Sequence, residues 1–228
     1  MKHALSCFFL VVLLSLLCFP LSAVAVSSGE ALDFTSSKAE PQGDGWKWDE
    51  ESRTLTLSGL ETEVTRAASR NCIFALRLPD GATIELADGS VNTITLSAAG
   101  SSSTSAYGIY SLGSISIVGN GALKVYMSGT GTSNSFGIYT TGGISISDGA
   151  DVYVEGGMTG RSSNSFSAGI FAAVSLSVNK ATLTASSIDD EAALVSCGIN
   201  VSGPLTLSDS SVSAAGASAA EESYGIRC

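Results

Sequence analysis

The sequence contains little histidine and few basic residues, and each shortage excludes a class of function. Its 228 residues include one His, 11 Lys or Arg and 21 Asp or Glu, so the formal net charge is -10. Because the histidine is His3, the body of the chain lacks the residue needed for a His-dependent triad or a His-rich zinc site. The acidic balance argues against nucleic acid as a partner and against binding to anionic lipid. The length suits one domain, or two small ones.

The first 25 residues have the pattern of a secretory signal peptide. Met1–His3 is a short basic start, residues 4–21 are almost wholly apolar, and Ser22–Ala25 ends the run with small residues. This order predicts cleavage after Ala25, and therefore a secreted or cell-surface protein with no membrane span in the mature chain. The alternative is an uncleaved N-terminal membrane anchor, against which Pro20 argues.

Cysteine is sparse and irregularly spaced. Lipidation at Cys18 is disfavoured, because Leu17 stands where a lipoprotein site normally has a small residue. The mature chain keeps Cys72, Cys197 and Cys228, an odd number without a C-x-x-C motif or metal-ligand spacing. The pattern predicts buried or unpaired thiols in place of a disulfide framework.

An internal repeat is the strongest signal in the sequence. The motif Tyr-Gly-Ile-Tyr at Tyr107–Tyr110 recurs, with variation, about every 29 residues. Its later copies are Phe136–Tyr139, Ala168–Phe171, Cys197–Asn200 and Tyr224–Arg227. A degenerate earlier copy is expected at Cys72–Ala75.

Two short runs of alternating apolar and polar residues follow each copy. After the first copy they are Ile115–Ile117 and Leu123–Val125, and the later copies are followed by 144–146 and 152–154, 176–178 and 183–185, and 205–207 and 212–214. Alternation at period 2 predicts strands with one buried face. About three short strands per unit, stacked unit on unit over residues 72–228, predict an all-β fold, a parallel β-helix or β-solenoid.

Polar residues recur where each middle strand is predicted to end. They are Asp88, Asn120, Asp148, Asn179 and Asp209. Asn and Asp side chains bond neighbouring backbone groups and tolerate left-handed corners, so we interpret these residues as turn formers. A calcium site is the alternative, because acids in register offer oxygen ligands. Its candidate ligands are Asp148, Asp151, Asp189 and Asp190.

The region before the repeats is predicted to close one end of the solenoid. Residues 26–44 are polar without a clear period and are expected to form a loose entry segment. Residues 45–71 are predicted to form an N-terminal β cap, with an aromatic strand containing Trp46 and Trp48 and an alternating strand at 54–60. Terminal units of a solenoid must differ from internal ones. The tryptophans are interpreted as a cover for the core, with a platform for a sugar ring as the functional alternative.

Four motifs in this order resemble a known family. They are Gly45–Asp49 (G-W-K-W-D), Thr54–Leu60 (T-L-T-L-S-G-L), Leu78–Leu86 (L-P-D-G-A-T-I-E-L) and the repeated Gly-Ile-Tyr. Over residues 45–228 the chain is similar to secreted bacterial proteins, common in Firmicutes, that are known as carbohydrate-binding domain-containing proteins. The resemblance implies a right-handed parallel β-helix, related in shape to polysaccharide lyases. It also implies an extracellular, non-catalytic binder of polysaccharide or cell surface, with calcium as a candidate cofactor, and it transfers no binding residue.

No group of residues requires catalysis as its explanation. β-Helix lyases use a Lys or Arg beside an acidic sugar bound to calcium, and β-helix hydrolases use clustered Asp. The bases of the repeat region do not recur in register, and Asp148 with Asp151 is interpreted as a solvated pair on a turn. The sequence therefore predicts that the protein is not an enzyme. A lyase or hydrolase ranks third, after the two binding hypotheses given below.

Aromatic residues after the Gly-Ile motif make a better case for binding. If Ile109 points into the core, alternation turns Tyr110 outward, and Tyr139 and Phe171 hold the same position in the next two units. At about 4.8 Å per strand, these rings would form a flat strip on which sugar rings stack. The alternative is that the alternation slips at a corner and the rings fill the core or the corner.

Two functional hypotheses follow. The first is a binding module for polysaccharide or glycoconjugate, with Tyr126 and Tyr153 as further outward candidates on the neighbouring sheet. The second is an adhesin-like or structural solenoid that binds protein partners or no small ligand.

The sequence stops at Cys228 without a visible C-terminal cap, wall anchor or partner domain, which predicts a truncated repeat region or a fragment. An open final rung leaves unpaired strand edges, so we expect end-to-end self-association there.

Overall fold

The computed structural model describes residues 27–36, 41–67, 72–99, 104–130, 132–157, 159, 165–188 and 193–228. The predicted signal peptide, residues 1–25, and the predicted calcium ligands Asp189 and Asp190 lie outside this part of the chain. All structural statements below concern the described residues.

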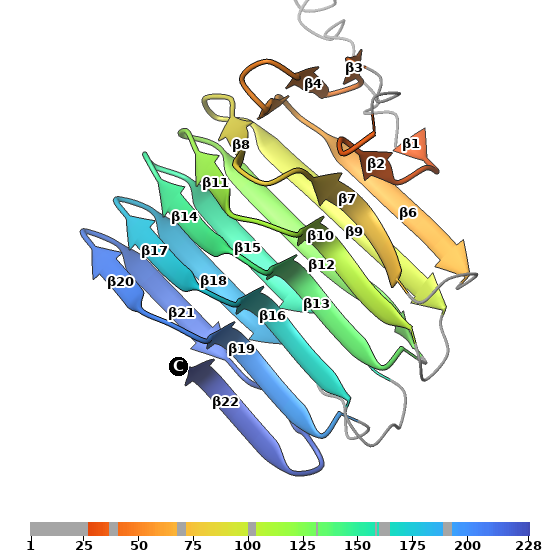
Figure 1. Ribbon diagram of the computed structural model, residues 1–228, viewed down its shortest axis with the longest axis vertical. Helices are drawn as coiled ribbons and strands as arrows, with labels where there is room; N and C mark the ends of the chain where they lie inside the picture. The colour runs from red at the N-terminus through yellow and green to blue at the C-terminus, as the bar shows by residue number, and fades with distance from the viewer. Residues whose placement is uncertain are drawn as a thin grey trace, which may run out of the picture.

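The chain forms three β-sheets in which nearly all neighbouring strands are parallel (Figure 1). Sheet A contains, in spatial order, β1 (Ser27–Ser28), β6 (Glu61–Ala67), β9 (Val91–Ala99), β12 (Ala122–Thr130), β15 (Asp151–Gly156), β18 (Thr182–Ser187) and β21 (Ser211–Ala215). Sheet B contains β2 (Leu32–Asp33), β7 (Cys72–Leu78), β10 (Ser105–Ser111), β13 (Asn134–Thr140), β16 (Phe166–Ala172), β19 (Val195–Val201) and β22 (Glu222–Arg227). Sheet C contains β3 (Gln42–Gly43), β4 (Trp46–Asp49), β5 (Thr54–Leu57), β8 (Ala82–Leu86), β11 (Ile115–Val118), β14 (Gly143–Ser147), β17 (Ser175–Asn179) and β20 (Leu205–Ser208).

Each turn of the chain places one strand in sheet C, one in sheet A and one in sheet B, as β8, β9 and β10 do. Each internal strand pairs in parallel with the strands one turn before and one turn after it, so the turns stack into a β-solenoid of about five turns. This arrangement confirms the predicted all-β, parallel β-helix fold. The described residues contain no helix, and hence none of the length and apolarity needed to cross a membrane.

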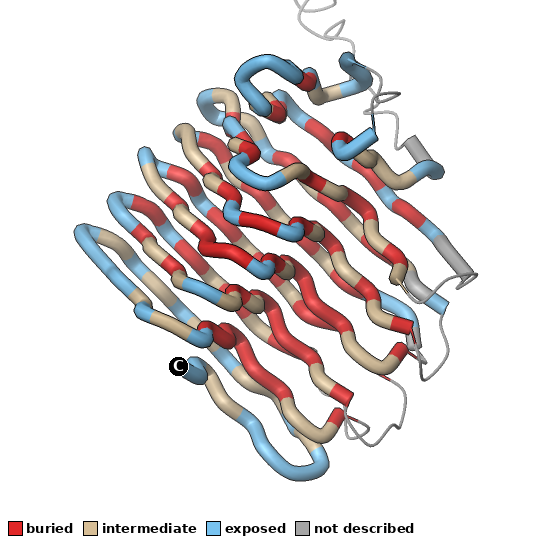
Figure 2. Tube along the Cα trace, viewed as in Figure 1, coloured by how far each residue is buried: buried red, intermediate tan, exposed pale blue. Residues whose placement is uncertain are grey.

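The core lies between the sheets and consists of columns of similar residues. In sheet B one column contains Leu76, Ile109, Ile138, Ile170 and Ile199, which pair in register from strand to strand and are all buried. Figure 2 shows how buried positions alternate with partly exposed ones along the strands. Burial of one such side chain contributes about 1.5–3 kcal/mol. Stacking therefore stabilises strands that would be too short to persist alone.

A break in side-chain alternation at the glycine, which the paired strands share without an extra residue on either and which we call the glycine bulge, explains the Gly-Ile repeat. In β13, Phe136 and Ile138 have register partners on both neighbouring strands, whereas Gly137 between them has none. Gly137 and Ile138 are both buried, so the alternation shifts, and Phe136 and Tyr139 both lie outside the main core. An added Cβ on Gly137 would lie 2.2 Å from Cγ1 of Val154, so this turn has no room for a side chain at the glycine.

The first copy of the repeat lies two residues later than predicted. The register pairs Phe74 with Tyr107 and Leu76 with Ile109. The copy is therefore Phe74–Arg77, in place of the predicted Cys72–Ala75, and Ala75 occupies the position of the glycine.

Left-handed residues form the corners between sheets C and A. Asp148, Lys180 and Asp209 have φ angles of 60°, 51° and 49°. A left-handed backbone is what Asp and Asn tolerate better than most residues. The angles therefore agree with the interpretation of Asp148 and Asp209 as turn formers.

Asn92 closes one corner from inside the core. Its side-chain oxygen accepts hydrogen bonds from the backbone N–H groups of Gly59 (2.8 Å) and Leu60 (3.0 Å), and its amide nitrogen donates to the carbonyl of Ala122 (3.0 Å). The residue is fully buried and pairs in register with Leu123, so a polar side chain begins an otherwise apolar column. These bonds satisfy groups that would be costly to bury unpaired.

The N-terminal end differs from the internal turns. β4 pairs antiparallel with β3 and β5, and parallel stacking within sheet C begins at Thr54 in β5, inside the range that the sequence assigns to the cap. β1 and β2, from the range predicted to be loose, pair in parallel with β6 and β7. Phe34 stacks on Trp48 with ring centroids 4.8 Å apart. Phe34 and Trp48 both belong to the main core cluster.

Candidate functional site

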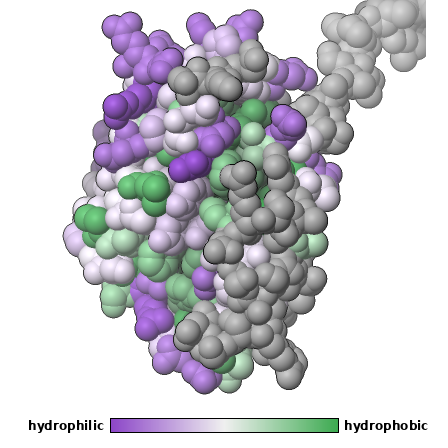
Figure 3. Space-filling model, turned by 45° about the vertical axis from the view of Figure 1, so that its right-hand side comes forward, coloured by the Kyte–Doolittle hydropathy of each residue, from purple (hydrophilic) through white to green (hydrophobic). Residues whose placement is uncertain are grey.

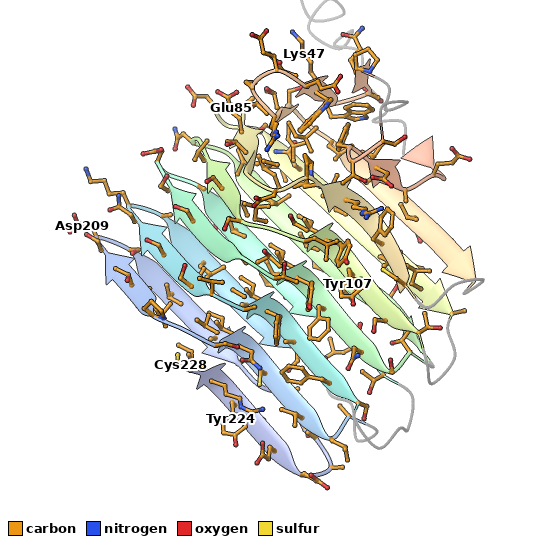
Figure 4. All side chains as sticks on the ribbon, in the orientation of Figure 1. Lys47, Glu85, Tyr107, Asp209, Tyr224 and Cys228 are labelled. Atoms are coloured by element: carbon orange, nitrogen blue, oxygen red, sulfur yellow. The ribbon has the colours of Figure 1, made fainter. Side chains whose placement is uncertain are left out.

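The outer face of sheet B carries a group of aromatic side chains that we name the aromatic cluster. Its members come from the four adjacent strands β7, β10, β13 and β16, and they are Phe74, Tyr107, Tyr110, Phe136, Tyr139, Phe166 and Phe171. They lie on the side of the sheet away from the main core, where Tyr107 is labelled in Figure 4. The cluster is the largest assembly of rings among the described residues.

One column of the cluster was predicted from the sequence. Tyr110, Tyr139 and Phe171 pair in register on β10, β13 and β16, and each is half-buried and directed outward as expected. Their ring centroids are 5.8 and 5.0 Å apart, with interplanar angles of 21° and 11°. The rings therefore stack face to face along the solenoid axis. The flat strip expected from the sequence does not form, because ring edges, not ring faces, point toward solvent.

A second column was missed by the sequence reasoning. Phe74, Tyr107 and Phe136 precede the bulge on β7, β10 and β13 and pair in register. Tyr107 lies 4.7 Å from Tyr110 between ring centroids, at an angle of 34°. The two columns therefore pack side by side. The signal that could have revealed the second column is the aromatic residue that stands directly before Gly in three copies of the repeat, as Tyr107, Phe136 and Tyr224.

The two columns give the cluster a small core of its own. Phe136 is 4% exposed, although it lies on the outer face, because Tyr107, Tyr139 and the edge-on ring of Phe166 surround it. Farther along the same column, Cys197 is fully buried as a free thiol, and burial raises its pKa to about 11. The free thiols at the other two described cysteines agree with the sequence prediction.

The centre of this face carries no charge, whereas its two ends do. β10, β13, β16 and β19 contain no ionisable acid or base among their residues apart from tyrosine and cysteine. At one end Arg77 lies 5.8 Å from the ring centre of Phe74 and 5.7 Å from that of Tyr110, and it contacts Asp33 at 3.4 Å. At the other end Arg227 lies 5.5 Å from the ring centre of Tyr224. In the view of Figure 3, hydrophilic residues gather toward the ends of the solenoid and paler or hydrophobic ones lie between.

Burial keeps the phenols of the cluster protonated. It raises the pKa of Tyr107 to about 12 and raises the pKa values of Tyr110 and Tyr139 above the usual 10.0. Each hydroxyl therefore remains a neutral group that both donates and accepts hydrogen bonds. An arrangement of apolar ring edges with three such hydroxyls suits a ligand that is itself uncharged and rich in hydroxyl groups.

The other predicted aromatic residues lie elsewhere. Tyr126 and Tyr153 are half-buried on the outer face of sheet A, with ring centroids 5.4 Å apart at 42°. The hydroxyl of Tyr153 donates to Glu155 Oε2 at 3.0 Å. This pair is separate from the aromatic cluster, because it belongs to a different sheet.

The two tryptophans pack at the N-terminal end. Trp48 is 7% exposed beneath Phe34, and Trp46 meets the same ring edge to face at 5.2 Å and 71°. Trp46 also covers Gly43, where an added Cβ would lie 2.3 Å from its Nε1. Little of Trp48 is accessible to a ligand, and neither residue joins the aromatic cluster.

Two of the four predicted calcium ligands, Asp148 and Asp151, lie within the described residues. Asp148 accepts a hydrogen bond from the Ser147 hydroxyl at 2.9 Å, and Asp151 begins strand β15. In the described part of the chain, no three side chains of His, Cys, Asp or Glu come together as metal ligands. Asp189 and Asp190 lie outside the described residues, so their part in a site stays a prediction.

Comparisons with protein-family models, with curated proteins and with solved structures found no match for this chain. The resemblance to secreted carbohydrate-binding proteins therefore remains a prediction, while the β-solenoid itself is established by the strand pairing.

Proposed function

We propose that this chain is a secreted or cell-surface, non-catalytic binding module for polysaccharide or glycoconjugate, and that the aromatic cluster is its contact surface. The observation that carries the proposal is the ordered ridge formed by Tyr110, Tyr139 and Phe171 on three adjacent strands, beside the hydroxyl of Tyr107. Membership of the family that the sequence resembles, the carbohydrate-binding domain-containing proteins, is part of the same proposal.

Physical chemistry favours such a ligand at this face. The exposed ring edges offer apolar contact to the C–H groups of a sugar, and phenol hydroxyls exchange hydrogen bonds with sugar hydroxyls. Each column runs perpendicular to the strands, along the solenoid axis, and contains one residue per strand at a spacing of about 4.8 Å. A linear glycan would therefore lie along the solenoid axis and meet successive turns with successive residues.

A second candidate function has one observation in its favour. The ring faces of Tyr110, Tyr139 and Phe171 are already occupied by each other, and Phe136 is buried beneath them. A ridge of this kind also stabilises a solenoid without any ligand. The alternative proposal is therefore an adhesin-like or structural solenoid, which binds protein partners or has no small ligand.

The mature chain on a glycan array, followed by titration calorimetry on each positive glycan, tests the first proposal. Tyr139→Ala, in the middle of the ridge, should weaken binding about tenfold or more, as for a central contact of an interface. Tyr153→Ala on sheet A is the matched control and should leave affinity unchanged. Melting temperatures of both variants show whether the fold is intact.

Two outcomes would overturn parts of this proposal. The absence of binding to every glycan by the unmodified chain would reject the first function and favour the second. Binding that survives Tyr139→Ala and disappears with Tyr153→Ala would keep a glycan-binding function and reject the aromatic cluster as its site. Repeating the titrations with a chelator tests calcium, for which the expected ligands are Asp148, Asp151, Asp189 and Asp190.

Export is proposed from the sequence and is tested separately. N-terminal sequencing of the protein recovered from the culture medium should begin at Val26. Recovery of the full-length chain in the membrane fraction would contradict cleavage and favour the uncleaved anchor.

A further inference from the structure

A column of outward residues crosses six neighbouring strands of sheet B. From β7 to β22 its members pair in register, and they are Arg77, Tyr110, Tyr139, Phe171, Asn200 and Arg227. The three aromatic members form the ridge, and Asn200 stands next to it on β19. A polar side chain therefore occupies the position at which the stack of rings ends.

The side chain of Asn200 is almost covered and has no hydrogen-bond partner. It points outward, because the preceding Ile199 belongs to the main core, yet only 9% of the residue is exposed. No residue that the structure describes forms a hydrogen bond with its amide group. Among these residues every side-chain nitrogen or oxygen that is sealed from solvent has a partner, so the amide of Asn200 reaches the surface.

Other asparagines with low exposure do have partners. Fully buried Asn92 makes the hydrogen bonds described above, and half-buried Asn134, on the same face of sheet B, donates to Ser105 Oγ at 3.1 Å. An amide that gives up most of its water without gaining a partner loses free energy. A ligand that hydrogen-bonds Asn200 removes this loss, so we interpret the residue as a ligand contact.

The neighbours of Asn200 in the column differ in chemistry. Half-buried Phe171 on one side offers an apolar ring edge, and Arg227 on the other side offers N–H donors. The guanidinium of Arg227 lies 5.5 Å from the ring centre of Tyr224, which Figure 4 labels, and its Nη1 is 3.9 Å from Glu222 Oε2. Because Glu222 offsets the positive charge, this end of the ridge favours a neutral polar group over an anion.

An acetamido group fits these three neighbours. Its carbonyl accepts and its N–H donates a hydrogen bond, and the amide of Asn200 offers the complementary donor and acceptor. Its methyl group provides apolar contact for the ring edge of Phe171, and its carbonyl is also of the kind that Arg227 can bond. A sugar hydroxyl has no methyl for Phe171, and a carboxylate would be repelled by Glu222.

We propose that Asn200 makes the site selective for glycans that contain an N-acetylated amino sugar. The acetamido group would lie between the ring edge of Phe171 and Arg227 and would hydrogen-bond the amide of Asn200, while the rest of the glycan follows the ridge. This inference rests on the proposed function, because it places the glycan on the aromatic cluster.

Two tetrasaccharides with the same β-1,4 linkage test the selectivity. One consists of N-acetylglucosamine and the other of glucose, so they differ in the acetamido group alone. Titration calorimetry with the unmodified mature chain should show about tenfold tighter binding of the N-acetylated tetrasaccharide, which corresponds to one additional hydrogen bond. The ratio of the two dissociation constants is the measured quantity.

A matched pair of variants assigns the selectivity to one residue. Asn200→Leu keeps a side chain of similar size without the amide, so it should weaken binding of the N-acetylated tetrasaccharide about tenfold and bring the ratio close to one. Asn179→Leu removes an exposed amide on sheet C and should leave the ratio unchanged. Melting temperatures show whether each variant is folded, and Asn200→Ala replaces the leucine variant if that one does not fold.

The outcomes distinguish this inference from the function on which it rests. Equal binding of both tetrasaccharides by the unmodified chain overturns the inference, and so does a preference that survives in Asn200→Leu. Tighter binding of a uronate oligosaccharide also overturns it, because Arg227 would then be the selective residue. In each of these cases the chain still binds glycans, whereas a chain that binds no glycan on the array rejects the proposed function and this inference with it.

Discussion

Gly137→Ala is the most direct test of the bulge that positions the aromatic cluster. Besides its 2.2 Å approach to Cγ1 of Val154, the new Cβ would lie 2.8 Å from the carbonyl oxygen of Gly169 and 3.1 Å from that of Glu155. Nonbonded carbon atoms prefer about 3.5–4.0 Å. Val154 is fully buried, and the two oxygens belong to strand backbones, so none of the three neighbours moves freely.

The expected loss of stability is at the upper end for overpacking, about 3 kcal/mol. For a chain of this length about 2–4 °C is lost per kcal/mol, so the melting temperature should fall by about 6–12 °C. Differential scanning calorimetry and urea unfolding measure the change. Gly29→Ala is the control, since nothing lies within 4 Å of its added Cβ.

A double-mutant cycle separates the steric cause from other effects. Val154→Ala removes the nearest contact, so the cost of Gly137→Ala should be smaller in that background. A loss below about 1 kcal/mol for Gly137→Ala alone would refute the reasoning, because it would mean that the strand backbones adjust. Ala75 holds the equivalent position in an earlier turn, so one turn does accept a methyl group there. A small loss of stability for Gly137→Ala is therefore a result that the experiment could give.

Three further predictions concern single residues. Asn92→Leu should cost about 1–3 kcal/mol, because it leaves the buried N–H group of Leu60 in the β5–β6 turn without a partner; urea unfolding measures this loss. The folded state holds the Tyr107 proton with a pKa of about 12 against 10.0 for the ordinary group, so its stabilising contribution is complete below pH 10 and is lost as the pH rises through 12; an absorbance titration of tyrosinate should show this phase. A thiol-reactive disulfide should label exposed Cys228 within minutes at neutral pH and buried Cys197 only after unfolding or near pH 11.

Each of these predictions has a contrary result. An Asn92→Leu chain as stable as the original would show that water or a shifted backbone replaces the lost hydrogen bonds. Tyr107→Phe should remove the latest tyrosinate phase, and its persistence would assign that phase to another residue. Equal labelling rates for Cys197 and Cys228 in the folded protein would contradict the burial of Cys197 on β19.

The solenoid was predictable because its signal is periodic. Ile109 and its counterparts recur at one position of each unit, and stacking turns that periodicity into a column. The predicted direction of Tyr110 followed from simple alternation after Ile109. The strands themselves are longer than the three-residue runs, since polar residues beside those runs also pair with the neighbouring turn.

The rest of the site depends on features that alternation does not express. Tyr107 is two residues before Ile109, so strict alternation places both on the same face, and only the bulge at Gly108 separates them. Ring orientation is set by contacts between neighbouring turns, which no single unit contains. The sequence therefore indicated where Tyr139 points and did not indicate that its face is covered by Phe171.

The unbroken register between turns makes the molecule modular along its axis. Every internal unit contributes the same two outward positions, so gain or loss of one complete unit would lengthen or shorten the outer face by one step of about 4.8 Å. The neighbours of such a junction would meet the same kinds of residue as before. Evolution or design could in this way match the reach of the surface to its target without rebuilding the scaffold.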